Sequence, residues 1–416
     1  MQNSNRQLII VTTIVIFTLL QFIILYALGY TPYPDSNGYI LLAKKCIQMN
    51  EPYPVASQIH DLPFIWNVGA INLVALSLKL FGSVTPLLCV YSLMKGCSAW
   101  LVYRIDNIIF KERTAFITLL LYVAYPANYG ESTSVLSELP FTFLILLGIL
   151  AALKRQNVTG GMIMAFANWI RPMGIVFLLS TIIYQFIAKK KKASLNILCG
   201  YLLVIACISY LSYLRTGYCI YQAKTGWMAL LQYSVDNSPE NDEHYTKADA
   251  YNAIQKDSIW QRRTIEWIAN NPKEYIRQMP KKLLKTYISD NVNFCAFLPN
   301  KKESEYMYGE IDMRTLAHSF PNYNAVQWLT VCNLIYYYIL LALSILGSIM
   351  ALRHSISVSF AIPISVIIIG TALLLLAGHG EARFHIPFMP FIIMIAATFF
   401  SNKLDKYKTW IRNNQL

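Results

Sequence analysis

The sequence predicts an all-α polytopic membrane protein, a bundle of about ten transmembrane helices with extracytoplasmic juxtamembrane helices and a loop domain. Hydrophobic residues make up 56% of the 416 positions and charged residues only 14%, whereas about a quarter of a soluble domain is charged. The apolar residues also form runs of roughly 20, the length that crosses a hydrocarbon core. A soluble enzyme with one apolar helix is therefore excluded.

Ten segments are expected to span the membrane. The first has no small-residue cleavage site behind it, so we interpret it as a retained helix and not as a signal peptide. The expected spans are residues 8–28, 85–103, 114–130, 139–153, 160–170, 172–188, 195–214, 325–352, 357–377 and 385–400. Residues 64–81 are also long enough, but they include Asn67, Asn72 and Lys79. We expect this segment to lie along the interface as an amphipathic helix.

The distribution of basic residues decides this topology. With residues 64–81 at the interface, 15 Lys and Arg lie in the short loops of one side and 5 in those of the other, which is the bias of cytoplasmic loops. If 64–81 spanned the membrane, 14 of those 15 charges would move outside. Both termini are therefore expected in the cytoplasm. The net charge of +13 belongs to these scattered clusters and does not indicate a nucleic-acid-binding face.

The resulting organisation has three parts. Residues 1–214 form an N-terminal transmembrane module with its first extracytoplasmic loop at 29–84, residues 215–323 form an extracytoplasmic loop domain, and residues 324–416 form the C-terminal transmembrane helices. The loop domain carries 14 basic and 13 acidic residues. It also contains an amphipathic helix expected at 259–269, which indicates a folded cap and not a linker.

The eight cysteines are scattered along the chain, and no pair has the spacing of a zinc site. Cys219 and Cys295 share the long loop. They would be able to form a disulfide if that loop is extracytoplasmic. The alternative is that both remain free thiols.

Two acidic residues are expected near the extracytoplasmic ends of spans. Asp35 lies in the segment TPYPDSNGY after the first span, where partial desolvation makes a carboxylate more basic and suits it to act as a general base. Its alternative role is to cap a helix or to form an Asx-turn. Glu138, in the sequence Ser-Glu-Leu-Pro, heads the fourth span. Its alternative role is to complement the dipole of that helix.

Two basic residues lie where a charge is costly in lipid. Arg171 stands with Pro172 between two short apolar segments, so it either faces a cavity or partner or extends to the lipid headgroups. Lys95 lies in the middle of the second span. We expect Lys95 to pair with a carboxylate in preference to binding substrate.

The segment before the last span, residues 378–387, has four ionisable residues in seven positions: His379, Glu381, Arg383 and His385. Arg383 and His385 are suited to hold a phosphate, because a guanidinium makes two-pronged contacts with its oxygens. The alternatives are structural ion pairing and a divalent metal site made of His379, Glu381 and His385, whose spacing does not match that of a zinc helix. We favour anion binding and predict neither a resident metal nor another cofactor.

These side chains are all expected on the extracytoplasmic side. They place two carboxylates and two or three cations around one cleft at the membrane surface. Such a cleft suits a substrate with an anionic head and a long lipid tail. The sequence contains neither a Gly-rich phosphate loop nor a D-x-D motif that would indicate a nucleotide-sugar donor.

Five features follow one another in a recognisable order. An aspartate follows the first span, a juxtamembrane helix ends in Leu-Phe-Gly, an acid occupies the second extracytoplasmic turn, an Arg-Pro pair joins two spans, and Arg-Phe-His-Ile-Pro-Phe-Met-Pro opens the last span. In the same order, these five features are Asp35 with Tyr39, Leu80 to Gly82, Glu138, Arg171 with Pro172, and Arg383 to Pro390. In this order the chain resembles the GT-C glycosyltransferases that use polyprenyl-phosphate sugars, in particular the family 39-like protein O-mannosyltransferases and lipid A aminoarabinose transferases. The likeness covers most of the chain, although each motif is short.

Two departures from that family concern single residues. Its basic or His-Pro element in the first loop is approximated here by His60 to Pro63, and its second-span basic residue, frequently arginine, is Lys95. The stretch 260–285 is similar to an amphipathic segment common in bacterial members. These differences bear on the sugar and the acceptor more than on the fold.

The resemblance implies a GT-C-like fold and an integral membrane glycosyltransferase. This enzyme would move a sugar from a polyprenyl-phosphate carrier to a hydroxyl or phosphate of a glycan, lipid or protein, with inversion, on the extracytoplasmic side of a bacterial inner membrane. Asp35 would act as the base with help from Glu138, and Arg383, Arg171 and His385 would bind the lipid phosphate. Further candidates for substrate contacts are Tyr39, His60, Lys95, His379 and Glu381. The alternatives are a polysaccharide polymerase or ligase and a transporter of lipid-linked saccharides.

Overall fold

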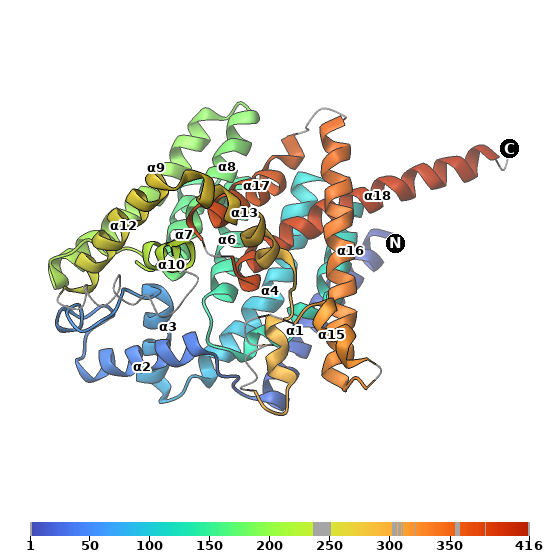
Figure 1. Ribbon diagram of the computed structural model, residues 1–416. Coiled ribbons are helices and arrows are strands. Elements are labelled where there is room, and N and C mark those ends of the chain that lie inside the picture. Colours follow the sequence, from blue (N-terminus) through green and yellow to red (C-terminus); the bar gives the residue numbers. More distant parts are fainter. Residues whose placement is uncertain are drawn as a thin grey trace.

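The computed structural model is built almost entirely from helices (Figure 1). It describes the whole chain except residues 1, 236–250, 302–305, 307–308, 310, 321, 354–357, 379 and 415–416. In the described part of the chain, extended pairing is limited to one bridge between Ile65 and Lys224. The prediction of an all-α fold is therefore confirmed.

Helices occur at all ten expected spans. They are α1 (Gln2–Leu28), α4 (Thr85–Ile109), α5 (Glu112–Ala124), α6 (Glu138–Leu153), α7 (Asn157–Ile170), α8 (Gly174–Ile187), α9 (Lys191–Thr216), α16 (Ala325–Arg353), α17 (Ala361–Ala377) and α18 (Met389–Asn414). Among the residues that the structure describes, 6 helices are long and apolar enough to cross a membrane, or up to 7 if a bent pair counts as one span. The chain is thus a polytopic membrane protein, and the count of about ten spans stays a prediction.

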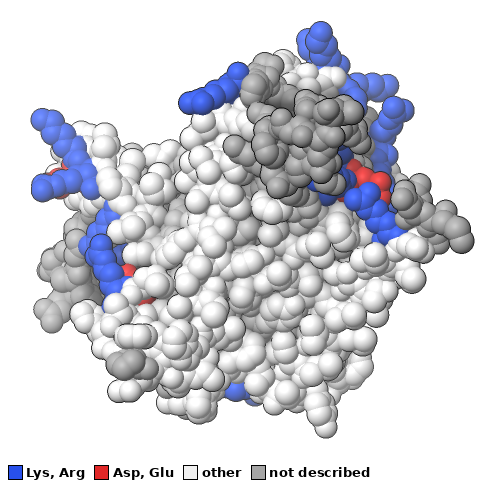
Figure 2. All heavy atoms as spheres, turned by 90° about the vertical axis from the view of Figure 1, so that its right-hand side faces the viewer, with Lys and Arg blue, Asp and Glu red and all other residues white. Residues whose placement is uncertain are grey.

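The exterior of the helix bundle is suited to lipid. Only 22% of the apolar window of α1 and 28% of that of α9 are buried, and large side chains such as Leu8 and Leu203 are exposed. On the face shown in Figure 2, a broad area without charged side chains separates groups of Lys and Arg. An apolar surface of this extent is a liability in water but matches the hydrocarbon core of a bilayer.

Small residues allow the spans to pack closely. α7 lies between α6 and α9. A Cβ on Gly161 of α7 would lie 1.9 Å from the carbonyl oxygen of Ile197 in α9, and a Cβ on Gly200 would lie 2.1 Å from that of Val158. A Cβ at either position would overlap a carbonyl oxygen of the neighbouring helix, so only glycine fits. This close approach of two backbones is how helices pack in a membrane.

Two further α-helices lie between α1 and α4 in the chain. α2 (Pro34–Gln48) and α3 (Val68–Phe81) pack against each other at the lower left of Figure 1. α3 coincides with the segment expected at the interface and has 14 residues, fewer than a span requires. It ends at Gly82, whose φ of 67° is a left-handed conformation that glycine adopts without strain. Its placement at the membrane surface remains a prediction.

The long loop between α9 and α16 contains several helices. These helices are α10 (Gly226–Val235), α12 (Ala253–Asn270), α13 (Pro272–Tyr287), the 3-10 helix η4 (Val292–Phe297) and α15 (Met313–Ser319). The amphipathic helix expected at 259–269 is the C-terminal part of α12, which begins with a capping box formed by Asn252 and Gln255. Val292 and Phe294 of η4 pack in a buried cluster with Tyr33. That the loop is a separate domain stays a proposal.

The disulfide considered for this loop does not form. Cys219 is exposed, Cys295 is buried, and both are free thiols. Burial raises the pKa of Cys295 to about 12 despite the hydrogen bond that its thiol makes with Tyr33. Cys295 is therefore a packed core residue and not a partner for Cys219.

Candidate active site

Four segments that are far apart in the sequence bring charged side chains together. Pro34 occupies the first turn of α2 and places Asp35 in that turn. Glu138 begins α6. Arg171 is the extended residue at which α7 ends, and Arg383 belongs to the 3-10 helix η6 (Ala382–Phe388) that leads into α18.

Arg383 is the centre of this arrangement. Its Nη1 lies 2.6 Å from Asp35 Oδ2, and its Nε lies 2.5 Å from Glu381 Oε1 and 3.8 Å from Glu138 Oε1. One guanidinium therefore contacts three carboxylates. We call Asp35, Glu138, Arg171, Glu381 and Arg383 the charge cluster.

The inner part of the charge cluster is a buried ion pair. Arg171 Nη1 lies 2.9 Å from Glu138 Oε1, with the two side chains 9% and 2% exposed. The same Nη1 donates a hydrogen bond to Ser137 Oγ at 3.0 Å. The guanidinium also lies 5.3 Å from the centre of the Phe384 ring, a favourable position for a cation. Arg171 thus faces a protein partner, and extension to the lipid headgroups is not observed.

The outer part of the cluster is more accessible. The side chains of Asp35 and Arg383 are 27% and 17% exposed, whereas that of Glu138 is nearly inaccessible. An anion approaching from outside would therefore reach the Asp35–Arg383 pair before the Glu138–Arg171 pair. A carboxylate and a guanidinium in one partly open site can accept a proton and hold an anion, respectively.

Neutral polar groups connect the cluster to α2 and α3. Asn67 donates through Nδ2 to Tyr39 Oη at 2.7 Å and to Ser137 Oγ at 3.1 Å. Burial raises the pKa of Tyr39, and the nearby charges of Asp35 and Glu138 act in the same direction. The phenol therefore stays neutral and accepts the hydrogen bond from Asn67. In the sequence Asn67 is only a polar residue within an apolar segment, and this pattern does not predict its contacts with Tyr39 and Ser137.

Two of the basic residues singled out in the sequence lie elsewhere. His385 is fully buried, with Nδ1 2.6 Å from the carbonyl oxygen of Thr286 and Nε2 3.6 Å from Asp290 Oδ1. It lies near Asp290, while its neighbour Arg383 joins the charge cluster. Lys95 pairs with Glu131 at 2.5 Å, as expected of a lysine that prefers a carboxylate partner.

Four candidates for substrate contacts remain: Tyr39, Glu381, His60 and His379. Tyr39 is buried beside the cluster, and Glu381 belongs to it. His60 is exposed in the first loop. His379 lies outside the described residues. Among the residues that are described, no three His, Cys, Asp or Glu side chains are grouped so that they could hold a metal ion.

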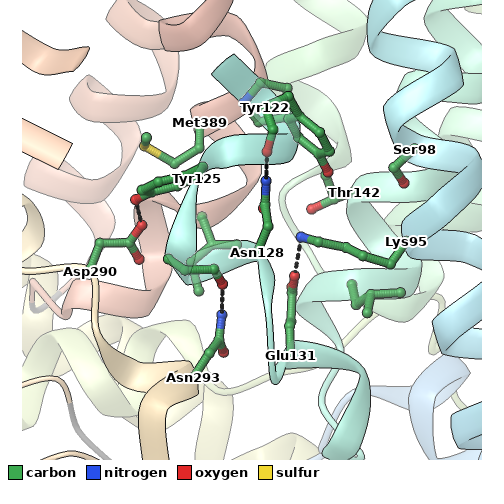
Figure 3. Close-up of a pocket in the computed structure, with 14 residues that line it drawn as sticks. Lys95, Ser98, Tyr122, Tyr125, Asn128, Glu131, Thr142, Asp290, Asn293 and Met389 are labelled. Carbon is green, nitrogen blue, oxygen red and sulfur yellow. Dashed lines mark hydrogen bonds and ion pairs between the residues drawn. The ribbon is translucent and has the colours of Figure 1, made fainter. Parts of the chain in front are cut away.

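A second group of polar side chains lines a pocket inside the bundle (Figure 3). Lys95 points toward Glu131, and Tyr125 donates a hydrogen bond to Asp290. Asn293 Nδ2 donates to the carbonyl oxygen of Ala127 at 2.9 Å. Neither Glu131 nor Asp290 was identified from the sequence, because only the fold reveals which lysine and which tyrosine they meet.

The comparisons with known proteins concern the fold alone. No family model and no curated protein matches the chain. Among solved structures, the chain is similar to an archaeal oligosaccharyltransferase, AglB from Archaeoglobus fulgidus, in complex with an inhibitory peptide and a dolichol-phosphate, with a TM-score of 0.51 and 12% identity. The match covers 99% of this chain and 52% of the other, so the chain spans about half of that protein's length. The protein is therefore an all-α polytopic membrane protein with a GT-C-like fold.

Proposed function

We propose that the protein is a membrane glycosyltransferase that moves a sugar from a polyprenyl-phosphate carrier to an acceptor hydroxyl on the extracytoplasmic side. The observation that carries the proposal is the charge cluster, in which an arginine and a carboxylate remain partly exposed at the meeting point of α2, α6 and η6. The GT-C-like fold supports it, and the solved neighbour is itself named an oligosaccharyltransferase.

In the proposed reaction Arg383 binds the phosphate of the lipid carrier. The acceptor oxygen attacks C1 of the sugar while the bond between C1 and the phosphate oxygen breaks, which inverts the anomeric centre. Negative charge grows on the departing polyprenyl phosphate. A guanidinium already in place stabilises that charge more in the transition state than in the ground state and so lowers the barrier.

Asp35 is proposed as the base. It removes the proton of the acceptor hydroxyl, so the proton ends on the Asp35 carboxyl and the electron pair of the broken bond ends on the phosphate. In the structure Asp35 is held by Arg383 at 2.6 Å. Glu138 is almost inaccessible and holds Arg171, so its proposed role is to position the two arginines.

The test of this assignment is the conservative variant Asp35→Asn. It keeps the shape and removes the charge, so the protein is expected to insert and fold while transfer from polyprenyl-phosphate monosaccharides is lost. The matched control is Asp61→Asn, which neutralises an exposed acid of the same loop and is expected to leave turnover unchanged. Near-normal turnover of Asp35→Asn would remove Asp35 from the catalytic role.

An oligosaccharide ligase is the second candidate, because the neighbour's name refers to transfer of an oligosaccharide. The donors separate the two functions. Purified protein that releases sugar from a lipid-linked monosaccharide is the enzyme proposed, whereas protein that acts only on a lipid-linked oligosaccharide is a ligase. A transporter would release sugar from neither donor.

A further inference from the structure

An aromatic side chain, Trp66, packs against α2, the helix that carries Asp35 of the charge cluster. Trp66 and Phe64 precede α3, and both are half-buried. Their ring centres are 4.9 Å apart with an interplanar angle of 38°. The backbone around Trp66 is held on both sides: its N–H donates to Tyr53 Oη at 2.9 Å, and the N–H of Lys224 donates to the carbonyl oxygen of Ile65 at 2.8 Å.

The indole packs on the face of α2 that carries Asp35. Asp35, Gly38 and Tyr39 occupy positions i, i+3 and i+4 of one helix and therefore share a face. A Cβ on Gly38 would lie 3.1 Å from Cη2 of Trp66. The rings of Tyr39 and Trp66 meet edge to face at 5.8 Å. The indole thus contacts α2 at residues that lie one helical turn after Asp35.

A second connection runs through the neighbour of Trp66 in the chain. Asn67 donates hydrogen bonds to Tyr39 and to Ser137, and Ser137 in turn accepts one from Arg171. The peptide that positions the indole is therefore tied to α2 through Tyr39 and to Arg171 of the charge cluster through Ser137. Rotation of α3 away from the cluster would break these bonds.

We propose that Trp66, backed by Phe64, is the surface against which the pyranose ring of a substrate sugar stacks beside Asp35. This subsite rests on the proposed glycosyl transfer. A pyranose presents C–H bonds on one face, and their slightly positive hydrogens fit the negative face of an indole. Its hydroxyl groups then remain free to meet the carboxylates. The sugar belongs either to the donor or to the acceptor.

The first experiment does not require transfer. The full-length protein in a detergent without a sugar headgroup is mixed with methyl glycosides of glucose, mannose and galactose, and saturation-transfer NMR reports which ring protons touch it. Wild type is expected to saturate the C–H protons of at least one glycoside, and Trp66→Leu is expected to lose that signal. Equal signals from both proteins, or no signal from wild type with any glycoside, would overturn the proposal.

The matched control is Trp328→Leu. Trp328 is 47% exposed and packs edge to face on Tyr323, and it lies in α16, which contributes nothing to the charge cluster. This variant is expected to keep the wild-type signal. Trp66→Phe retains a smaller ring and is expected to keep part of it, which separates loss of stacking from misfolding.

Kinetics then identify the sugar. With a lipid-linked donor that wild type uses, Trp66→Leu is expected to raise one KM by about three- to tenfold with little change in kcat, the effect of one lost stacking contact. A higher KM for the donor assigns the surface to the donor sugar, and a higher KM for the acceptor assigns it to an acceptor sugar. If wild type transfers nothing, the proposed function fails, while the NMR experiment still tests the subsite.

Discussion

Neutralising Glu138 is expected to destabilise the protein by about 3–5 kcal/mol, the usual result of removing one partner from a buried ion pair. Glu138 Oε1 lies 2.9 Å from Arg171 and 3.8 Å from Arg383. At an effective dielectric constant of about 20 each of these contacts is worth roughly 4–6 kcal/mol. The desolvation of the buried charges offsets part of this energy. Glu138→Gln keeps the shape and leaves Arg171 buried without its carboxylate.

The assay is a double-mutant cycle of Glu138→Gln and Arg171→Gln, with the free energy of unfolding measured in mixed micelles. The double variant is expected to lose less than the sum of the two single losses by about 1–3 kcal/mol, since it contains no unpaired buried charge. The matched control is Arg262 with Glu266, an exposed pair at 4.0 Å with side chains 73% and 64% exposed. Neutralising that pair is expected to change stability by about 0.5 kcal/mol or less.

Additive losses would refute this reasoning. If the double variant lost the sum of the single losses to within about 0.5 kcal/mol, Glu138 and Arg171 would not stabilise each other in the folded protein. The buried geometry of the inner pair would then be wrong, and the proposed positioning role of Glu138 would fail with it.

Two further predictions concern single side chains. Arg383→Lys keeps the positive charge, but an ammonium cannot span the oxygens of Asp35 and Glu381 as a guanidinium does; transfer from polyprenyl-phosphate sugar is expected to fall about a hundredfold, and turnover near that of wild type would contradict phosphate binding by Arg383. In the folded protein Cys219 is expected to react with a membrane-impermeant maleimide from outside intact cells. Cys295 is expected to stay unlabelled between pH 7 and 9, because its pKa of about 12 keeps it protonated, and labelling of Cys295 as fast as Cys219 would contradict its burial.

The helices could be predicted from the sequence because lipid imposes a simple pattern. An apolar run as long as 8–28 or 325–352 is too hydrophobic to form a surface helix of a soluble protein, so it predicts a membrane helix. The structure has α1 and α16 at these two runs. The same reasoning brought Asp35, Glu138, Arg171 and Arg383 together, because each stands where a span begins or ends on the same expected side.

The contacts inside the bundle could not be predicted in this way. His385 follows Arg383 by two residues, and in a 3-10 helix two such side chains point about 120° apart around the helix axis. One therefore joins the charge cluster, while the other turns toward Asp290. A sequence shows that a buried histidine needs a partner, but the partner is set by the packing of α13 and η4, which have no apolar runs of spanning length.

The composition of the charge cluster bears on the order of events in the proposed reaction. Its three carboxylates and two guanidinium groups give a formal charge of −1, which disfavours an added anion, so we expect a phosphate to replace a carboxylate on Arg383. Asp35 is the most exposed of the three carboxylates, at 27% against 16% for Glu381 and 2% for Glu138. Its displacement from Arg383 therefore leaves the least charge buried without a partner. Once displaced, Asp35 no longer neutralises Arg383 and is free to accept a proton. The arrival of the donor would thus create the base, so that an acceptor hydroxyl is activated only when a sugar is in place to receive it.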